Sequence, residues 1–254
     1  MSILEVQGLQ KVYTTRFGGN KVEALKNVSF TVENGEYVAI MGESGSGKTT
    51  LLNILAALDH PTAGSVVLDG QDLSTVKESQ IAAFRRDNLG FVFQEFNLLD
   101  TFTLEDNIYL PLVLAGKSHQ QMQQRLIPIA RELGITELLR KYPYAVSGGQ
   151  KQRAAVARAI ITGPKLVLAD EPTGALDSKA TDELLRLFGQ INADGHTVLM
   201  VTHSVKAASH ANRVLFIKDG EVFHQIYRGT QTNEQLYQKI SDTLTMLATG
   251  GDRI

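Results

Sequence analysis

The sequence contains no cysteine, and this absence excludes disulfides, thiolate zinc sites and cysteine nucleophiles. It agrees with a reducing compartment without demonstrating one. Long apolar runs are also missing, because no window approaches the roughly 18 uninterrupted apolar residues of a membrane-spanning helix. The opening segment MSILEVQGLQ has no basic stretch followed by an apolar one, so no leader peptide is predicted. We expect a chain that stays soluble or reaches a membrane through a partner.

Concentrated positive charge is missing as well. Lys and Arg number 25 against 27 Asp and Glu, the formal net charge is −2, and adjacent basic residues occur only as isolated pairs such as Arg85–Arg86. Nucleic-acid-binding surfaces need clustered Lys and Arg, so we predict no nucleic-acid partner. The chain does have 43% hydrophobic and 20% charged residues, a composition that is typical of a folded protein with a substantial core.

Short apolar runs alternate with longer helical patterns. The runs are YVAIM, LGFVF, KLVLAD, TVLMV and RVLFI, and such alternation predicts an α/β fold with a parallel sheet and flanking helices. The earlier runs ILEVQGL, VSFTV and SVVLDG lie too close together for crossover helices. They predict a second, smaller antiparallel sheet.

Helical patterns replace the strand pattern between Gln94 and Gly163. They predict a helical subdomain, residues 94–162, inserted into a single domain that spans residues 1–254. The segments 1–93 and 163–254 are then predicted to form the α/β core with its antiparallel β subdomain.

The segment GESGSGKT, residues 42–49, matches G-x-x-x-x-G-K-[ST] between a predicted strand and a predicted helix. Its glycines let backbone N–H groups converge on phosphate oxygens, and the helix N-terminus adds partial positive charge. Lys48 is predicted to reach the β- and γ-phosphates, and the Thr49 hydroxyl to join a Mg²⁺ shell. An ordinary glycine turn is the alternative, and the strand and helix around the segment argue against it. The nucleotide-binding residues predicted here are Gly42, Ser44, Gly45, Ser46, Gly47, Lys48, Thr49 and Thr50.

Two acidic residues end the apolar run KLVLAD. Asp170 and Glu171 fall at the carboxyl end of a predicted strand, where open parallel sheets form their ligand crevice. Asp170 is predicted to hold Mg²⁺, and Glu171 to polarise an attacking water. Alone, the pair would be interpreted as a solvated strand end; its combination with the phosphate-binding loop favours catalysis.

Other polar residues at the ends of predicted strands have weaker signals. His203 follows TVLMVT and is predicted to contact the γ-phosphate. Gln94 ends LGFVFQ, where its amide is predicted to touch Mg²⁺ or water and to report the nucleotide state to the helical subdomain. Either residue, taken alone, is as well explained as a surface or packed residue. Asp177 belongs to the nucleotide site or only caps the following helix, and both interpretations stay open.

The segments GESGSGKTT, FVFQ, VSGGQ, KLVLADE, GALD and VTH occur in this order, and with them the chain resembles the ATPase subunit of ABC transporters over nearly its whole length. The resemblance implies a P-loop NTPase core of RecA-like type whose helical subdomain carries the signature VSGGQ. It also implies a homodimer that encloses two ATP molecules. The residues that would face the γ-phosphate held by the opposite subunit are Ser147, Gly148, Gly149 and Gln150. A helix that starts with a hydroxyl and two glycines suits an anion.

The same resemblance assigns adenine stacking to Tyr13, although Phe17 competes for this role and packing on the early strands is the alternative. The chain departs from the commonest family pattern at two places. Val146 replaces the usual Leu before the signature Ser, and Gly174 replaces the usual Ser before ALD. Neither change removes a catalytic group.

A narrower resemblance is carried by KYPYAVSGGQKQR, NLLDTFT and RVLFIKDGEVFHQIYRG. These look most like the bacitracin-resistance branch of the macrolide- and lipoprotein-transporter clan. That branch implies ATP hydrolysis coupled to an integral-membrane permease, resistance to peptides such as bacitracin and nisin, and often a sensor histidine kinase reached through the permease. The chain would then lie peripherally on the cytoplasmic face of the cell membrane.

The same motifs leave other functions open. Within the clan, ATPases of lipoprotein release, macrolide efflux or cell division would share every catalytic motif. A non-transport ABC ATPase of DNA repair or translation would need a second ATPase domain, a coiled-coil insertion or a basic surface. A regulatory nucleotide-binding module without turnover is opposed by Glu171 and His203.

The segment NLLDTFTLEDNIYLPL concentrates apolar side chains in the predicted helical subdomain. We expect it to supply part of a groove for a cytoplasmic helix of the permease. The residues expected there are Phe96, Leu98, Leu99, Phe102 and Tyr109, with packing inside the subdomain as the alternative.

Overall fold

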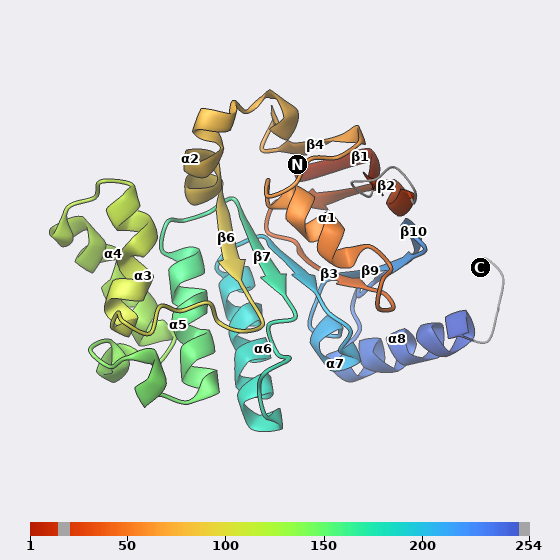
Figure 1. Cartoon of the computed structure of the whole chain (residues 1–254). Coiled ribbons are helices and arrows are strands. Elements are labelled where there is room, and N and C mark those ends of the chain that lie inside the picture. Colours follow the sequence, from red (N-terminus) through yellow and green to blue (C-terminus); the bar gives the residue numbers. More distant parts are fainter. Residues whose placement is uncertain (15–20, 249–254) are drawn as a thin grey trace. The chain divides into compact units, whose positions relative to one another are not determined.

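The computed structural model describes residues 1–14 and 21–248 of the chain. Its contacts divide the chain into two compact units, which are described separately (Figure 1). Unit 1 consists of Met1–Thr75 and Leu199–Ile254, and unit 2 of Val76–Val198. Among the described residues, no helix combines the length and apolar character needed to cross a membrane.

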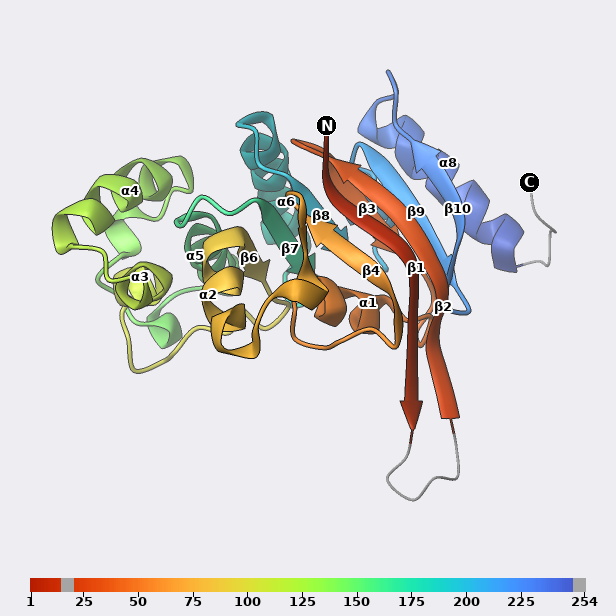
Figure 2. The same ribbon diagram turned by 90° about the horizontal axis from the view of Figure 1, so that it is seen from above.

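Unit 1 begins with two long antiparallel strands, β1 (Ser2–Thr14) and β2 (Lys21–Glu33), which lie side by side in Figure 2. In β2, the buried Val28, Phe30 and Val32 alternate with exposed Ser29 and Thr31, as expected for a strand with one buried face. The strand β4 (Ala63–Leu68) pairs with β1, and the short β5 (Gln71–Asp72) pairs with β4.

The predicted antiparallel pairing of the early strands is confirmed, but the prediction of a second sheet is wrong, because these strands continue into the other strands of unit 1. The strand β2 pairs with β10 (Glu221–Tyr227) through the residues Asn27 and Glu221. The order continues through β9 (Arg213–Lys218) and β3 (Tyr37–Met41) to β8 (Val198–Val201). Every residue of β3 is buried, which explains its continuous apolar sequence.

The helices of unit 1 follow these strands. The helix α1 (Lys48–Leu55) begins where the glycine-rich loop ends, and α7 (Val205–Ala208) follows β8. The predicted amphipathic tail forms α8 (Asn233–Ala248), whose Leu236 and Ile240 are fully buried. A single 3₁₀ turn, Leu73–Thr75, ends this part of the unit.

Unit 2 contains two parallel strands, β6 (Leu89–Val92) and β7 (Leu166–Asp170), and five helices among its described residues. The helices are α2 (Glu78–Asn88), α3 (Leu104–Leu114), α4 (His119–Glu132), α5 (Gly148–Ile160) and α6 (Ser178–Ala193). Two 3₁₀ turns, Thr136–Leu138 and Pro143–Ala145, separate α4 from α5. The apolar runs and helical patterns noted in the sequence coincide with these elements.

The helix α5 is the centre of unit 2, because it packs against β6, α3, α4 and α6. Its contact with β6 is close: a Cβ atom added to Gly90 would lie 2.3 Å from the carbonyl oxygen of Ala159. Only glycine allows this approach of strand and helix. The bounds 94–162 for a helical subdomain remain a prediction.

Candidate functional site

The glycine-rich loop of unit 1 connects β3 to α1 and has a shape that requires glycine at two positions. A Cβ atom on Gly42 would lie 2.3 Å from the carbonyl oxygen of Ile217 and 2.6 Å from Ser46 Oγ. Gly47 has φ 101°, and a Cβ atom there would lie 2.4 Å from the carbonyl oxygen of Ala24. The loop is therefore a tightly built backbone cradle rather than an ordinary turn.

The groups that this loop offers are suited to an anion. The N-cap of α1 is Gly47, which supplies no side-chain cap, and the partial positive charge of a helix N-terminus favours an anion there. Lys48 Nζ donates to the carbonyl oxygens of Gly42 at 2.8 Å and Glu43 at 2.7 Å. The Ser46 hydroxyl is buried and has no hydrogen-bond partner among the described residues. The predicted residues Ser44, Gly45 and Thr49 are exposed, and Thr50 is half-buried.

Tyr13 of β1 is 41% exposed and is held in place by two side chains. Its hydroxyl donates to Asp59 Oδ2 at 2.8 Å, and Lys11 Nζ donates to Asp59 Oδ1 at 2.6 Å. Lys11 Nζ also lies 4.8 Å from the centre of the Tyr13 ring, within the range of a cation–π contact. The sequence reasoning missed Lys11 and Asp59. Phe17 lies outside the described residues.

The Asp59 carboxyl is kept ionised by these contacts. Partial burial raises its pKa, but hydrogen bonds from Lys11, Tyr13 and the His60 N–H outweigh that effect, so the net pKa is lowered. The Tyr13 ring therefore has one cation beside it and a fixed hydroxyl.

His203 belongs to the same unit as the glycine-rich loop. The preceding residue, Thr202, donates its N–H to the carbonyl oxygen of Ile40 at 3.0 Å, and Ile40 lies in β3 just before the loop. The His203 side chain is exposed. Unit 1 thus brings the glycine-rich loop and His203 to the ends of neighbouring strands.

Unit 2 brings a second group of predicted residues together. Val92 of β6 pairs with Ala169 of β7 in a parallel register, so Gln94 and Asp170 follow at the same edge. Glu171 comes next and adopts φ 43°, a left-handed conformation that is uncommon for residues other than glycine. Asp170 and Glu171 are half-buried. Strain of this kind is concentrated at functional sites.

The signature segment has a structural role in its own subunit. Ser147 is the N-cap of α5 and accepts a hydrogen bond from the Gln150 N–H at 3.3 Å, while Gln150 Oε1 accepts one from the Ser147 N–H at 2.9 Å. This reciprocal pair is a capping box. A Cβ atom on Gly149 would lie 3.0 Å from Ala180 Cβ, and one on Gly148 would lie 3.6 Å from Leu176 Cδ2. Ser147 itself remains exposed.

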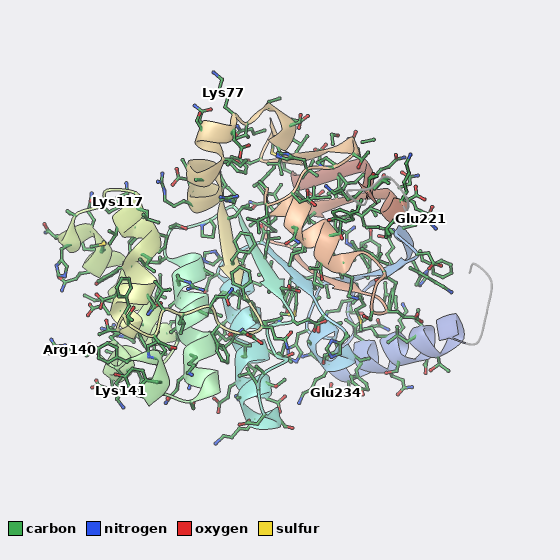
Figure 3. The ribbon with its side chains drawn as sticks, viewed as in Figure 1. Lys77, Lys117, Arg140, Lys141, Glu221 and Glu234 are labelled. Carbon is green, nitrogen blue, oxygen red and sulfur yellow. The ribbon has the colours of Figure 1, made fainter. Side chains whose placement is uncertain are left out.

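Positive charge lies just before the signature. Arg140 and Lys141 are exposed and extend from the edge of unit 2, as do Lys77 and Lys117 (Figure 3).

Downstream of the signature, Asp177 caps α6, because its Oδ1 accepts the Ala180 N–H at 2.8 Å. The capping interpretation of Asp177 is therefore confirmed, and a further role at a nucleotide stays a prediction.

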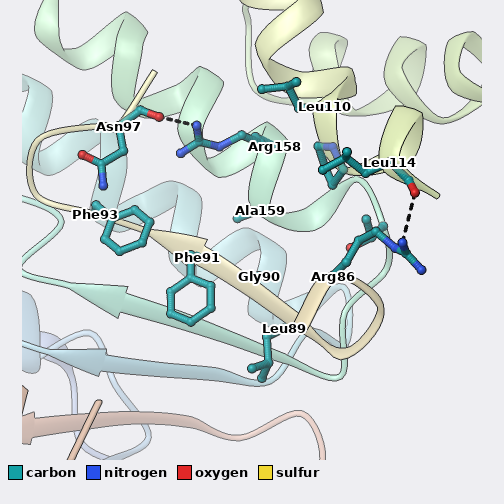
Figure 4. A pocket seen from close by; sticks show the side chains of 12 residues that line it. Arg86, Leu89, Gly90, Phe91, Phe93, Asn97, Leu110, Leu114, Arg158 and Ala159 are labelled. Atoms are coloured by element: carbon teal, nitrogen blue, oxygen red, sulfur yellow. Dashed lines mark hydrogen bonds between the residues drawn. The ribbon is translucent and has the colours of Figure 1, made fainter. Parts of the chain in front are cut away.

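A cavity of about 310 Å³ opens in unit 2 between β6, α3 and α5 (Figure 4). Its lining includes Phe91, Phe93, Leu110, Pro111, Leu114 and Arg158. The rings of Phe91 and Phe93 stack with their centres 5.4 Å apart. Arg86 donates to the Leu114 carbonyl oxygen at 3.0 Å at one end of the cavity.

The residues expected to form a groove are placed differently. Leu110 and Pro111, from the predicted segment, line the cavity. Tyr109 is only 6% exposed, and burial raises its pKa to about 12, so its ring belongs to the interior. Leu99 and Phe102 are 47% and 38% exposed but do not line the cavity. When a segment has apolar residues on both faces, its sequence does not show which of them are buried and which line a surface cavity.

Comparison with known proteins decides the family. Residues 25–174 match the model of the family described as "ABC transporter". The chain belongs to the ABC transporter family. Its match covers more than half of the sequence and includes the glycine-rich loop, the signature and the strand that ends at Asp170. Its P-loop NTPase fold and its recognition as an ABC ATPase subunit are confirmed.

Relatives cover nearly the whole chain. The ABC transporter ATP-binding protein YxdL of Bacillus subtilis is 50% identical over 97% of this chain and 95% of its own. The bacitracin export ATP-binding protein BceA of Halalkalibacterium halodurans is 46% identical over 97% of both chains. The macrolide export ATP-binding/permease protein MacB of Mannheimia succiniciproducens is 42% identical over 87% of this chain, but this match covers only 34% of MacB.

Solved structures similar to this chain belong to the same family. The cassette MJ0796, whose dimer is bound to ADP and Pi, is 38% identical and has a TM-score of 0.79 over 88% of this chain and 98% of its own. This ABC family member is therefore an ATP-binding, ATP-hydrolysing subunit of a transporter.

Proposed function

We propose that both groups of residues described above take part in ATP hydrolysis. In unit 1, the glycine-rich loop holds the phosphates, Lys48 neutralises the β- and γ-phosphates, and His203 contacts the γ-phosphate. In unit 2, Glu171 polarises the attacking water and Gln94 helps to orient it. This proposal is supported by the left-handed conformation of Glu171 and by the tight glycine cradle.

The same proposal includes Mg²⁺. The oxygen donors proposed for it are the Thr49 hydroxyl in unit 1 and the Gln94 amide oxygen and Asp170 carboxylate in unit 2, which are of the kind that Mg²⁺ prefers. Among the described residues there is no cluster of three His, Cys, Asp or Glu side chains, which suits an ion that is held largely by nucleotide phosphates and water. When bound, Mg²⁺ supplies charge neutralisation at the phosphates.

We infer that two copies enclose two ATP molecules and that the signature serves the partner's nucleotide. The dimeric form of the relative MJ0796 supports this inference. So does the exposed N-terminus of α5, where Ser147 lies at the start of a 13-residue helix. Its helix dipole favours a phosphate at this position. Tyr13 would stack on the adenine, with Lys11 and Asp59 holding its ring.

The membrane partner is proposed to be a permease, with the chain lying peripherally on the cytoplasmic face of the cell membrane. The cavity beside Leu110 and Leu114 is proposed to receive a cytoplasmic helix of that permease. Its apolar lining suits the apolar face of an amphipathic helix.

The transporter is proposed to confer resistance to peptide antibiotics of the bacitracin and nisin type, with a sensor histidine kinase attached through the permease. The single observation that carries this proposal is the end-to-end match to BceA, 46% identical over 97% of both chains. Macrolide export is the second candidate, because the MacB protein of Mannheimia succiniciproducens is 42% identical over 87% of this chain.

The experiment is copurification of this chain with a candidate permease, followed by phosphate-release assays with bacitracin, nisin and a macrolide. Lys48→Ala serves as the inactive control. Peptide-stimulated hydrolysis, together with peptide resistance in cells, is expected. Stimulation by the macrolide alone would support the second candidate. Hydrolysis that persists in Lys48→Ala would overturn the proposed ATP site.

A further inference from the structure

The helix α5 carries a fully buried glutamine that no part of the proposed site uses. Gln152 has no exposed surface, which is unusual for a polar side chain. Its Nε2 atom donates to the carbonyl oxygen of Phe93 at 3.1 Å and to that of Pro172 at 2.9 Å. Both hydrogens of one amide are thus given to two separate loops of unit 2.

The chemistry of the two partners fixes the orientation of this amide. Backbone carbonyl oxygens only accept, so the nitrogen of Gln152 must face them. This leaves Oε1 buried without a hydrogen-bond partner among the residues that the structure describes. An unsatisfied buried acceptor is unfavourable, and an apolar side chain of the same length would avoid it. Space filling alone therefore does not account for a glutamine here.

The two carbonyl groups belong to the loops that carry the proposed catalytic side chains. Phe93 directly precedes Gln94, and Pro172 directly follows Glu171. Pro172 has no N–H group, so its carbonyl oxygen is the one backbone hydrogen-bonding group through which this residue can be held. Glu171 has a positive φ, and such a conformation persists only where the surroundings hold it.

We propose that Gln152 is a positioning residue for ATP hydrolysis. By bridging Phe93 and Pro172, it sets the spacing between the Gln94 loop and the Glu171 loop and holds the Glu171 carboxylate at the attacking water. This inference rests on the proposed role of Glu171. The bridge holds the backbone beside Gln94 and Glu171, the residues proposed to handle the attacking water, so Gln152 acts mainly on the chemical step.

The test is Gln152→Met in the full chain copurified with its permease. Methionine keeps the length of the side chain and removes both donors. At saturating ATP, kcat is expected to fall on the order of 10- to 100-fold, because small displacements of a catalytic group are enough for such losses. KM for ATP is expected to stay within about twofold. Gln190→Met, at an exposed position of α6, is the matched control and should change neither value.

A double mutant separates positioning from a general structural defect. If Gln152 acts through Glu171, adding Gln152→Met to Glu171→Gln should lower the single-turnover rate by less than about twofold, because the two changes are not additive. Gln152→Asn keeps the amide but is one methylene too short to reach both carbonyls. It should lower kcat in the same way and serves if the methionine variant does not fold.

Each result decides the question. A kcat within about twofold of wild type in either folded variant would overturn the positioning role. So would parallel losses of kcat and ATP affinity, or additive losses with Glu171→Gln. If Glu171→Gln itself hydrolyses ATP at the wild-type rate, the proposed function of Glu171 fails together with this inference. If Glu171→Gln is inactive and Gln152→Met is active, this inference fails alone.

Discussion

The Gln94 side chain lies directly against the backbone of Gly174. A Cβ atom added to Gly174 would lie 2.9 Å from Gln94 Nε2 and 3.0 Å from Gln94 Cδ. The commonest ABC family pattern has Ser at the position of Gly174. In this chain the amide of Gln94 therefore occupies space that the Ser side chain would fill. The position of one proposed catalytic residue thus depends on the absence of a side chain in the loop after Glu171.

Gly174→Ala should turn the Gln94 amide away without damaging the fold. The obstacle is the end of a flexible side chain, so we expect a stability change below about 1 kcal/mol. If Gln94 orients water or Mg²⁺ as proposed, hydrolysis should fall several-fold while ATP affinity is kept. Phosphate release and thermal unfolding measure the two effects. Gly189→Ala is the control, because a Cβ atom there meets nothing within 4 Å; equal hydrolysis in both variants would argue against the role of Gln94.

Asp59→Asn should weaken ATP binding by loosening Tyr13. The variant loses the charge that pairs with Lys11 in a partly buried contact, and contacts of this kind contribute about 0.5–1 kcal/mol. We expect an affinity roughly two- to fivefold lower and little change in kcat. Titration with a fluorescent ATP analogue measures it, with the exposed Glu23→Gln of β2 as control. Because the Asp59 pKa is lowered in the folded chain, its stabilising effect is present at neutral pH and is lost as pH falls through that lowered pKa. Unchanged affinity would exclude Tyr13 from the adenine site.

Leu114→Glu should prevent permease binding while sparing the chain itself. Leu114 lines the cavity of unit 2 and is 71% exposed, so a charge there costs little stability but makes an apolar helix bind poorly. Copurified permease should fall at least tenfold, with unchanged thermal unfolding and ATP binding. Ile127→Glu is the control, because Ile127 is 56% exposed on α4 and does not line the cavity. Equal copurification of the two variants would place the permease elsewhere.

Much of the fold follows from local sequence patterns. Periodicity and length distinguish buried strands from amphipathic helices. These patterns were sufficient to predict the strands β3, β6, β7, β8 and β9 and the helices α3, α4 and α5. The strand β10 has a weaker pattern, since only Ile226 is buried among its seven residues, and it was not predicted. Through it the antiparallel strands join the other strands of unit 1.

The candidate site could be predicted only where its chemistry is contiguous in sequence. The glycine-rich loop carries its own backbone geometry, and Asp170 with Glu171 ends one strand. The partners of Tyr13 and Gln152 depend on tertiary contacts, because Tyr13 meets Asp59 across 46 positions and Gln152 meets Phe93 across 59. The capping box of α5 is contiguous in sequence but was not predicted. Ser147 and Gln150 have the spacing S-x-x-Q, which is typical of such a cap, but the segment was interpreted only as a ligand-binding signature.

Glu132→Gln should stabilise the chain at neutral pH. Partial burial and a hydrogen bond with Asp194 raise the pKa of the Glu132 carboxyl. Because this folded-state pKa is raised, the stability from the protonated form is fully present below the unfolded pKa and is lost as pH rises through the folded one. The melting temperature of Glu132→Gln relative to wild type should therefore increase between pH 4 and pH 7. The control is Glu137→Gln, an exposed acid of the turn after α4. A difference that is constant with pH would contradict the raised pKa of Glu132.

Glu171→Gln should bind ATP but hydrolyse it slowly, because the amide keeps the shape of the side chain and loses the base. The ATP-bound dimer should then accumulate, and gel filtration with multi-angle light scattering would detect it. The same variant should abolish peptide resistance while permease association is kept.

Adding Ser147→Arg to Glu171→Gln should oppose this dimer. Ser147 is exposed at the start of α5, and a bulky side chain there would enter the proposed contact with the partner's γ-phosphate, although its charge favours anions. Steric exclusion should dominate. Loss of the N-cap by itself costs about 1 kcal/mol, so a variant that loses an equivalent cap elsewhere is needed.

Ser118→Arg is that control, because Ser118 and Gln121 form the same capping box at the start of α4. Glu171→Gln protein is mixed in equal amounts with Glu171→Gln/Ser147→Arg or with Glu171→Gln/Ser118→Arg protein, and ATP-dependent dimers are counted. Contact in trans predicts fewer mixed dimers with the Ser147 variant than with the Ser118 variant, since only Ser147 would meet the partner's nucleotide. Equal dimer formation, or a Glu171→Gln protein that stays monomeric even with its permease, would reject contact in trans.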